Sequence, residues 1–572
     1  MKRTITNQDD RVLHAAWLLL ALIVLSLVIA IRTWLLGIPL ERDEGEYAYA
    51  GQLMLQGIPP YKVAYNMKFP GTYAAYAVIM SIFGQTIAGI HLGLLLVNAA
   101  TIALIFLLGR RLCDTTAGIA SAATYAVLSV SPSVVGLAAH AEHFVMLPVL
   151  GGTLLLLKAS NWPNSTRRDQ AGSERSKMAA RRIERPGARF VPSTGVSPYS
   201  WLCASGLLFG TGLLMKQPAV FVILFGAIFL LWNDIRCRFT SKRIALRFLT
   251  FAAGAILPFA ITCFVLWRAG VFDKFWFWTI DYARQYASLV PVSEAPKIFA
   301  ESVTKVVGPS WGLWSLAGLG LLAGFWAKRT RGSTALLLGL LTGLGLALSS
   351  GFYFREHYFT LVLPAVSLLG GVAISRLEDL VRSRAKAVQL APVIVLAAAL
   401  GLPIFGQRTF FFEASPVQAS RKVYGLSPFP ESVRIAEYLR DHTGPSDTIA
   451  VLGSEPQIYF YSSRHAATGY IYMYGLMELQ RYARQMQEEM IREIEVAGPR
   501  YLVLVKISGS WLRRPGSESL IFNWVNDHIK QFYDVVGLVN ILPPDHTDYY
   551  LDELPRPMPH LGNYILICRR KP

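Results

Sequence analysis

Long apolar runs separated by short polar loops dominate the first 406 residues of the chain. The first run covers Leu13 to Leu40 and is interrupted only by Arg32. It is too long for a signal peptide and lacks a clear small-residue cleavage site, so we expect an uncleaved transmembrane helix. Further apolar runs follow at 86–108, 116–136, 144–158, 200–215, 218–233, 245–267, 309–327, 334–350, 358–375 and 390–406. The pattern predicts a polytopic α-helical membrane protein with about eleven transmembrane helices.

Positively charged residues gather in alternate loops. The chain carries 55 Lys and Arg residues against 37 Asp and Glu residues, a net charge of +18. In a soluble protein this excess would suggest a nucleic-acid partner, but 53% of the residues in this chain are hydrophobic. An excess of Lys and Arg in cytoplasmic loops explains the charge instead, and we expect no nucleic-acid partner. These loops include Arg110–Arg111, an insertion at 159–199, Lys328–Arg331 and Arg382–Lys386, and the N-terminus falls on their side.

Two parts of the chain differ from this apolar pattern. The insertion at 159–199 has eight Lys and Arg residues against three Asp and Glu residues and is predicted to be disordered and cytoplasmic. From 407 onward, polar helix-like segments alternate with short β-rich runs, which predicts a small α/β domain. The helical segments cover 431–442 and 477–496, and the β-rich runs cover 447–452, 500–506 and 563–568. We therefore expect a transmembrane domain at 1–406 in the cytoplasmic (inner) membrane and an extracytoplasmic domain at 407–572.

The first outer loop, at 41–85, begins with a cluster of acidic residues. Glu41, Asp43, Glu44 and Glu46 all lie beside the end of the first span. Carboxylates at a bilayer surface are costly to desolvate and carry chemistry more often than packing. Asp43 is the candidate general base, and Glu44 would orient Asp43 or the acceptor. The alternative is a solvated loop in which Glu44 and Glu46 cap a helix.

Lys68 follows in the same loop, just before a predicted interfacial helix at 71–83. Nucleotide sugars are cytoplasmic, so a sugar donor at the outer face is expected to be a sugar on a polyprenyl phosphate. Transfer then needs a base for the acceptor hydroxyl and cations for the departing phosphate, but no nucleotide-binding loop. Lys68 offers a point charge for that phosphate. The alternative is a snorkelling lysine that anchors the interfacial helix.

Together these residues resemble a known family. An apolar helix, D-E-x-x-Y-A at 43–48 and K-x-P at 68–70 are similar to the GT-C glycosyltransferases, in particular the aminoarabinose-transferase and protein-mannosyltransferase-like group (glycosyltransferase family 39 or 83 type). The matching residues are Asp43, Glu44, Tyr47, Ala48, Lys68 and Pro70, and Phe69 stands where the family often has proline. The resemblance implies a GT-C fold, with Asp43 as catalytic aspartate and Lys68 as phosphate-binding lysine. The W-W-D-Y-G motif of oligosaccharyltransferases is absent, which argues against transfer of a whole oligosaccharide to asparagine.

The resemblance also suggests roles for residues in later outer loops. Glu142 occupies the second outer loop, where the family commonly has another acidic residue, and Glu142 and His143 are candidates for sugar or acceptor binding. A membrane-edge pair of Glu142 with His140 or His143 is the alternative. Lys216, in M-K-Q-P, resembles the T-K-G-P turn of the family and is a candidate ligand for the donor phosphate. It could instead be a helix-terminal cation ahead of Pro218, but a lysine on the outer side opposes the charge bias.

The stretch F-R-E-H-Y at 354–358 resembles an outward-facing H-Y that the family has before its tenth span. Arg355 is a candidate for the donor phosphate, and His357 and Tyr358 are candidates for the sugar or the acceptor. The alternative is an ion pair between Arg355 and Glu356 at the membrane edge.

Aromatic residues crowd the outer loop at 268–308, including Trp276, Trp278 and Tyr282. They could stack on a sugar or line the lipid tail, but an interfacial aromatic belt is the default expectation. In the outer domain, G-S-E-P at 453–456 could touch an acceptor, but an ordinary strand-to-helix turn explains it and is expected.

The sequence therefore favours an inverting glycosyltransferase that moves one sugar from a polyprenyl-phosphate donor to a lipid, polysaccharide or protein acceptor at the outer face of the membrane. No cofactor is assigned, and because the carboxylates form no clear ligand set, a divalent metal is left open. A transporter or flippase for lipid-linked or anionic solutes is the alternative, but it would place charged residues in mid-span, whereas these cluster at one end. A scaffold for an envelope-polymer machine, with inert carboxylates, is a third possibility.

Overall fold

The computed structural model describes residues 2–160, 197–327 and 330–572, with side chains described from residue 12 onward. Nearly all of the predicted cytoplasmic insertion at 159–199 lies outside these described residues.

Eight helical segments within the described residues are long and apolar enough to cross a membrane. They are α1 (Lys2–Trp34) from Val12 onward, α4 (Ile87–Leu112), α6 (Ala141–Ala159), η2 (Gln217–Ala219) with α9 (Val220–Arg236), α10 (Ser241–Arg268), α13 (Ala295–Val307) with α14 (Trp311–Trp326), α15 (Arg331–Leu348), and α17 (Lys386–Gln389) with α18 (Ala391–Gly406). The other three predicted spans coincide with α5 (Thr115–Leu128), α8 (Pro198–Met215) and α16 (Leu363–Val381), which pack inside the same bundle. A polytopic helical membrane protein is thus confirmed, while the number of spans stays a prediction.

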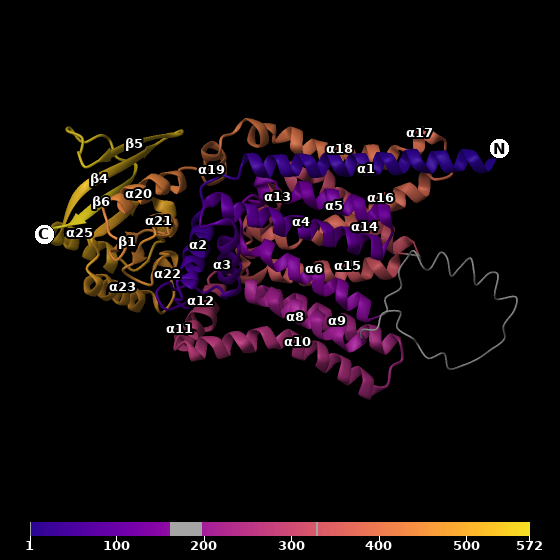
Figure 1. Ribbon diagram of the computed structural model, residues 1–572, viewed down its shortest axis with the longest axis horizontal. Helices are drawn as coiled ribbons and strands as arrows, with labels where there is room; N and C mark the ends of the chain where they lie inside the picture. The colour runs from indigo at the N-terminus through magenta and orange to yellow at the C-terminus, as the bar shows by residue number, and fades with distance from the viewer. Residues whose placement is uncertain (1, 161–196, 328–329) are drawn as a thin grey trace.

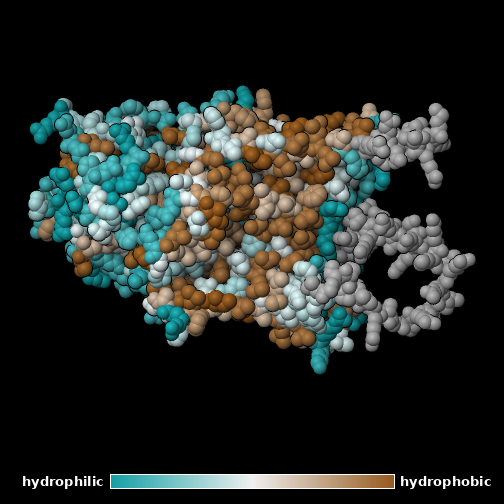
Figure 2. Space-filling model, in the orientation of Figure 1, coloured by the Kyte–Doolittle hydropathy of each residue, from teal (hydrophilic) through white to brown (hydrophobic). Residues whose placement is uncertain are grey.

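The molecule is elongated along the bundle axis (Figure 1). The N-terminal part of α1 and the C-terminal domain lie at opposite ends of this long axis. Figure 2 shows a broad hydrophobic band over the helices, between the hydrophilic C-terminal domain and a narrower hydrophilic rim at the other end. Such a band, bounded by polar surface on both sides, is typical of a protein that spans a bilayer.

Short helices lie between the bundle and the C-terminal domain. The predicted loop at 41–85 forms α2 (Arg42–Leu55) and α3 (Gly71–Phe83), so the interfacial helix predicted at 71–83 is present with those bounds. The loop predicted at 268–308 forms α11 (Phe272–Trp276), the π-helical segment η3 (Phe277–Tyr282), α12 (Ala283–Ala287) and α13. Before α16, the chain forms the 3-10 segment η6 (Glu356–Leu361). Helices α2, α3, α11 and α12 lie at the end of the bundle that faces the C-terminal domain (Figure 1).

The C-terminal domain is built on a mixed six-stranded sheet in the order β2-β1-β3-β6-β4-β5. Its strands are β1 (Thr448–Leu452), β2 (His465–Ala466), β3 (Tyr501–Lys506), β4 (Tyr533–Leu542), β5 (His546–Leu551) and β6 (Asn563–Arg570). Strand β1 pairs in parallel with β2 and β3, and the remaining pairs are antiparallel. Its helices are α19 (Pro416–Tyr424), α20 (Phe429–Asp441), α21 (Gln457–Ser462), α22 (Tyr474–Met477), α23 (Ala483–Ala497), α24 (Ser508–Trp511) and α25 (Leu520–Phe532). The three β-rich runs of the sequence correspond to β1, β3 and β6, whereas the hairpin of β4 and β5 was not predicted.

Helix α2 is clamped between the bundle and the C-terminal domain. One apolar core includes Tyr47 and Tyr73 of α2 and α3 together with Val451 and Ile458 of the C-terminal domain. Helix α2 contacts α21 so closely that a Cβ on Gly45 would lie 2.6 Å from the backbone nitrogen of Gln457. The two units therefore share a packed interior, and the position of α2 depends on both.

The turn at 453–456 fastens the same contact. Arg42 Nε donates a hydrogen bond to the carbonyl of Ser454 (3.1 Å), and Arg42 Nη2 lies 3.7 Å from Glu455 Oε1. Glu455 is fully buried and also accepts a hydrogen bond from Ser510 (2.6 Å). The predicted strand-to-helix turn is present, and its carboxylate anchors α2 to the C-terminal domain.

Gly45→Ala tests this close contact. The added methyl group has no room beside the backbone of Gln457, so we expect the free energy of unfolding to fall by about 1–3 kcal/mol, as for other overpacked sites. Gly509→Ala is the matched control, because nothing lies within 4 Å of a Cβ at Gly509. Thermal denaturation of the purified protein in detergent measures both variants. Equal stability of Gly45→Ala and Gly509→Ala would show that α2 and α21 are not packed this closely.

Candidate active site

The acidic stretch after the first span forms the start of α2. The Glu41 side chain accepts a hydrogen bond from the backbone N–H of Glu44 (2.9 Å), and the Glu44 side chain accepts one from the N–H of Glu41 (3.3 Å). This capping box satisfies N–H groups that a helix start leaves unpaired. The side chain of Asp43 takes no part in it and lies on the other side of the first turn, toward Lys68.

Lys68 is held between two carboxylates of α2. Its Nζ lies 3.0 Å from Asp43 Oδ1 and 3.0 Å from Glu46 Oε2. Glu46 also accepts a hydrogen bond from the hydroxyl of Tyr73 (2.6 Å), and Asp43 accepts one from the hydroxyl of Tyr472 (3.0 Å). The predicted convergence of Asp43 and Lys68 is therefore present, and the snorkelling alternative for Lys68 is wrong.

Burial and the neighbouring charges together set the pKa values of Asp43 and Lys68. Burial alone would raise the pKa of Asp43, but Lys68, with His357, His140 and Arg355 nearby, outweighs it and holds that pKa below its usual value. Burial alone would lower the pKa of Lys68, but Asp43 and Glu46 raise it well above its usual value. Asp43 is thus ionised and Lys68 charged.

Glu44 lies away from Asp43 and Lys68. Its Oε1 accepts a hydrogen bond from the backbone N–H of Ala139 (2.6 Å) and lies 3.1 Å from Nε2 of His91 in α4. Three cavities border the side chain of Asp43, and Glu44 lines none of them. These contacts fit a residue that fastens α2 to the bundle, as in the capping alternative, better than one that orients the acceptor.

Lys216 and Glu142 form a second ion pair beside the first. Lys216 Nζ contacts Glu142 Oε1 and lies 3.7 Å from the centre of the Tyr358 ring. His357 Nε2 is 4.0 Å from the same Glu142 oxygen. The membrane-edge pairing of Glu142 with His140 or His143 is therefore not present; His143 is buried and lines none of the three cavities.

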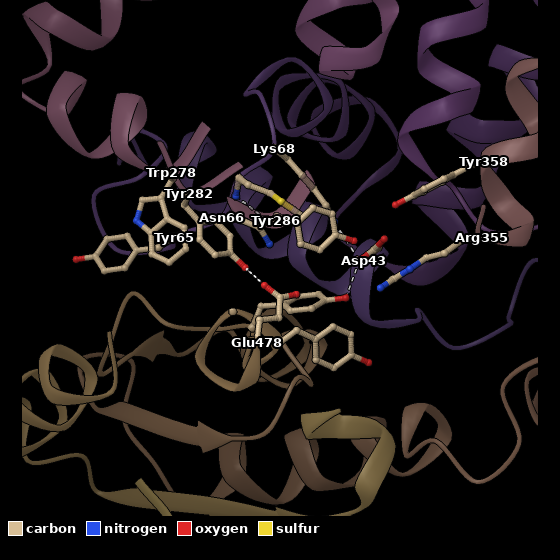
Figure 3. Close-up of a pocket in the computed structure, with 14 residues that line it drawn as sticks. Asp43, Tyr65, Asn66, Lys68, Trp278, Tyr282, Tyr286, Arg355, Tyr358 and Glu478 are labelled. Atoms are coloured by element: carbon tan, nitrogen blue, oxygen red, sulfur yellow. Dashed lines mark hydrogen bonds and ion pairs between the residues drawn. The ribbon is translucent and has the colours of Figure 1, made fainter. Parts of the chain in front are cut away.

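Arg355 reaches the site without a carboxylate partner within salt-bridge distance among the described side chains. Glu356 pairs instead with Lys305 (3.3 Å), so the predicted alternative of an Arg355–Glu356 pair is wrong. Figure 3 shows Arg355 and Tyr358 on the same side of Asp43. A guanidinium in this position is available to an anionic or hydroxyl-bearing ligand.

Three cavities meet at Asp43. The largest, which we call the membrane cavity, spans about 1540 Å³, including space open to solvent, and is mostly apolar, with residues such as Phe221 and Phe259 along it and Lys68 and Lys216 at its polar end. The aromatic pocket spans about 530 Å³, again including space open to solvent, and lies between α11–α12 and the C-terminal domain (Figure 3). The third, the polar cavity, spans about 970 Å³ and is also partly open. It is lined by Glu41, Arg42, Asp43, Pro132, Ser133, Val135, His140, Lys305, Arg355, Glu356, His357, Lys422, Val423, Tyr424 and Tyr472.

Asp43, His140 and His357 could together hold a metal ion. Each offers one ligand atom, and these atoms lie within 4.8 Å of one another. The rings of His140 and His357 stack at 4.2 Å, and neither ring nitrogen of His140 has a hydrogen-bond partner among the described residues. Two imidazoles and a carboxylate fit a divalent transition metal.

Solved structures resemble this chain, although no family model and no curated protein sequence matches it. ArnT from Cupriavidus metallidurans bound to undecaprenyl phosphate superposes with a TM-score of 0.57 at 14% identity, covering 96% of this chain and 97% of that chain. The archaeal oligosaccharyltransferase AglB from Archaeoglobus fulgidus, in complex with an inhibitory peptide and a dolichol-phosphate, gives 0.51 at 13% identity, covering 95% of this chain and 75% of that chain. The chain has the GT-C fold. The fold class predicted from the sequence is confirmed.

Sequence reasoning missed three residues of the site. Tyr472 contacts Asp43 from 429 positions away, and Glu478 enters the aromatic pocket from the C-terminal domain. The spacing of the chain gave no signal for either contact. Glu46 was assigned only to a cap, although its position three residues after Asp43 places both on one face of α2.

The carboxyl of Glu478 predicts a pH effect on stability. Burial raises its pKa from 4.5 to about 7, although a hydrogen bond from Tyr282 and the charges of Arg514 and Arg355 oppose the shift. Because the folded state holds this proton more tightly, its contribution to stability is full below pH 4.5 and is lost as the pH rises through about 7. In the wild type this effect lowers the free energy of unfolding by up to about 3 kcal/mol between pH 4.5 and 8, and Glu478→Gln should abolish that decrease.

The matched control is Glu488→Gln in α23, whose carboxylate is exposed and pairs with Arg484. Thermal unfolding at pH 5 and pH 8 compares the wild type with both variants. If Glu478→Gln keeps the pH dependence of the wild type, Glu478 is not a buried carboxyl with a raised pKa.

Proposed function

We propose that the protein is a membrane glycosyltransferase. It moves one sugar from a polyprenyl-phosphate donor to a lipid, polysaccharide or protein acceptor at the outer face of the cytoplasmic membrane, with inversion at the anomeric carbon. The N-terminus would then be cytoplasmic and the C-terminal domain extracytoplasmic, as the distribution of Lys and Arg predicts.

The observation that carries the proposal is the position of Asp43 at the polar end of the membrane cavity. The long apolar part of this cavity suits a polyprenyl chain. Lys68 and Lys216 line the same cavity beside Asp43, where the phosphate of such a chain would lie. One cavity thus combines an apolar channel, two cations and a carboxylate, which is what a lipid-phosphate donor requires.

Asp43 would act as the general base. It takes the proton of the acceptor hydroxyl as the hydroxyl oxygen attacks the anomeric carbon, and the bond from that carbon to the phosphate oxygen breaks. Lys68 and Lys216 stabilise the charge on the departing polyprenyl phosphate. A bound phosphate also adds negative charge beside Asp43 and attracts Lys68, and both effects make Asp43 a stronger base.

The remaining predicted residues take positions that suit this scheme. His357 and Tyr358 line the membrane cavity and can contact the donor. Arg355 lines the aromatic pocket and the polar cavity. Glu142 fixes Lys216 through their ion pair. A metal held by Asp43, His140 and His357 would supply further positive charge for the phosphate, although the steps above use residues of this chain alone.

The solved structures support the same class of donor. ArnT is described in complex with undecaprenyl phosphate, and AglB in complex with a dolichol-phosphate. Both ligands are polyprenyl phosphates, and each structure shares the GT-C fold with at least 95% of this chain. We therefore choose undecaprenyl phosphate as the lipid for the experiments.

Asp43→Asn tests the base directly. The amide keeps the size of the side chain and its hydrogen bond from Tyr472 but cannot accept the acceptor proton, so transfer should fall by about 10²- to 10⁴-fold. The measurement is transfer of radiolabelled sugar from undecaprenyl-phosphate donors to a membrane extract by the purified protein. Asp441→Asn, at an exposed carboxylate of the C-terminal domain, is the control and should keep full activity. Unchanged transfer by correctly inserted Asp43→Asn would contradict the proposal and favour a transporter or a scaffold.

A further inference from the structure

The C-terminal domain forms one wall of the aromatic pocket. Tyr472, Tyr474, Gly475 and Glu478 line it from this domain, and the segment η3–α12 and the loop before α3 line the opposite side. Figure 3 shows Glu478 pointing from the domain toward Tyr282 and the interior of the pocket. The pocket therefore exists only when the two parts of the chain are packed together.

The aromatic pocket continues from the membrane cavity. Both are lined by Asp43, Met67, Lys68, Tyr286 and Tyr358. Consider a donor whose tail occupies the membrane cavity and whose phosphate lies between Lys68 and Lys216. The group bonded to that phosphate would extend past Asp43 and enter the aromatic pocket.

The walls of the pocket combine apolar faces with hydrogen-bonding groups. Tyr65 stacks on Trp278 with ring centres 5.8 Å apart, and Tyr282 meets the same indole edge-on at 5.2 Å. A sugar ring has an apolar face of C–H groups and a rim of hydroxyls, and flat aromatic faces suit the former. Of the three aromatic residues named in the 268–308 loop, Trp278 and Tyr282 thus line the pocket, whereas Trp276 is exposed.

Glu478 supplies a hydrogen-bond acceptor inside this pocket. It is buried, and its described side-chain hydrogen bond is the one it accepts from the hydroxyl of Tyr282 (2.6 Å). Neither carboxylate oxygen of Glu478 is among the buried side-chain atoms left without a partner, so the oxygen that does not bind Tyr282 is open to the pocket that Glu478 lines. A ligand hydroxyl or ammonium can donate a hydrogen bond to it. Lys68 and Arg355 provide donors on the side of Asp43, so a ligand between them and Glu478 can be held at both ends.

We propose that the aromatic pocket binds the sugar of the donor, and that Glu478 selects this sugar by accepting a hydrogen bond from one of its hydroxyl or ammonium groups. This inference rests on the proposed function. It makes the C-terminal domain part of the donor site, with Glu478 as the residue that determines specificity.

The acceptor then enters from the polar cavity on the other side of Asp43. Inversion requires the acceptor oxygen to attack the anomeric carbon from the face opposite the departing phosphate. The polar cavity shares Asp43, Arg355 and Tyr472 with the aromatic pocket but has neither Lys68 nor Lys216 in its lining. Phosphate and acceptor thus reach Asp43 by separate routes.

Glu478→Gln, with Glu488→Gln as control, tests the inference. Purified protein in nanodiscs is titrated with undecaprenyl phosphate, and with undecaprenyl phosphate carrying glucose, mannose or 4-amino-4-deoxyarabinose. We expect the wild type to bind at least one sugar-linked lipid more tightly than the free lipid. Glu478→Gln should weaken binding of that sugar-linked lipid about ten- to a hundredfold and leave binding of undecaprenyl phosphate unchanged. If only the amino sugar increases the affinity over that of undecaprenyl phosphate, the partner of Glu478 is an ammonium. If glucose or mannose increases the affinity, the partner is a hydroxyl.

The outcomes separate this inference from the proposed function. If the wild type does not bind undecaprenyl phosphate at all, the proposed function fails. If it binds that lipid but the sugar adds no affinity, or if Glu478→Gln keeps the added affinity, the inference about the pocket is overturned while the enzyme stands.

Gly475→Ala gives an independent test that leaves the carboxylate in place. A Cβ at Gly475 would lie 2.8 Å from the hydroxyl oxygen of Tyr282, so the methyl group would displace the tyrosine and narrow the pocket. The same loss of sugar-dependent affinity is expected, again with unchanged binding of undecaprenyl phosphate. A variant that is stably folded and keeps the full sugar-dependent affinity would contradict the placement of the sugar.

Discussion

The end of the helix bundle beside the C-terminal domain depends on one lysine held between two buried carboxylates. Asp43 and Glu46 lie three residues apart on one face of α2, and both are within 3.0 Å of Lys68 Nζ. In a region of low dielectric two such carboxylates would repel each other strongly, and a lone ammonium would be costly to bury. Lys68 therefore stabilises both carboxylates, they stabilise its ammonium in return, and the loop that carries Lys68 is fixed to α2.

This ion cluster also explains how the site can respond to a ligand. In the free protein Lys68 neutralises Asp43, so Asp43 is a weak base. In the proposed reaction, a phosphate arriving through the membrane cavity would compete for the same ammonium and bring negative charge to Asp43. The base would become strong only when the donor is bound, which limits proton transfer to the complex that needs it.

The C-terminal domain also contributes to the site around Asp43. Its residues clamp α2 through Gln457 and Glu455, contact Asp43 through Tyr472, and complete the aromatic pocket with Glu478. A shared apolar core runs from α2 and α3 into the sheet. The domain is thus a wall of the site, and its packing against the bundle sets the geometry around Asp43.

The sequence allowed prediction of the membrane class, the α/β tail and the meeting of Asp43 with Lys68. These depend on local features: long apolar runs, alternating charge, and carboxylates and a lysine in one loop. For Glu44 the sequence left two roles open, because one pattern of acidic residues serves both a capping box and a catalytic pair; its contacts in the structure favour the cap. Contacts such as Tyr472 with Asp43 depend on how two distant segments pack, and no local pattern encodes that. The hairpin of β4 and β5 escaped prediction because its alternation is interrupted by Gly537 and Asn540, and the pairing partner β6 lies beyond the hairpin.

The most direct test is electron cryomicroscopy of the Asp43→Asn protein in nanodiscs with undecaprenyl phosphate. The account predicts density for the polyprenyl chain in the membrane cavity, with the phosphate in contact with both Lys68 and Lys216. Lipid density at another place on the bundle, with those two lysines still paired only to their carboxylates, would contradict it.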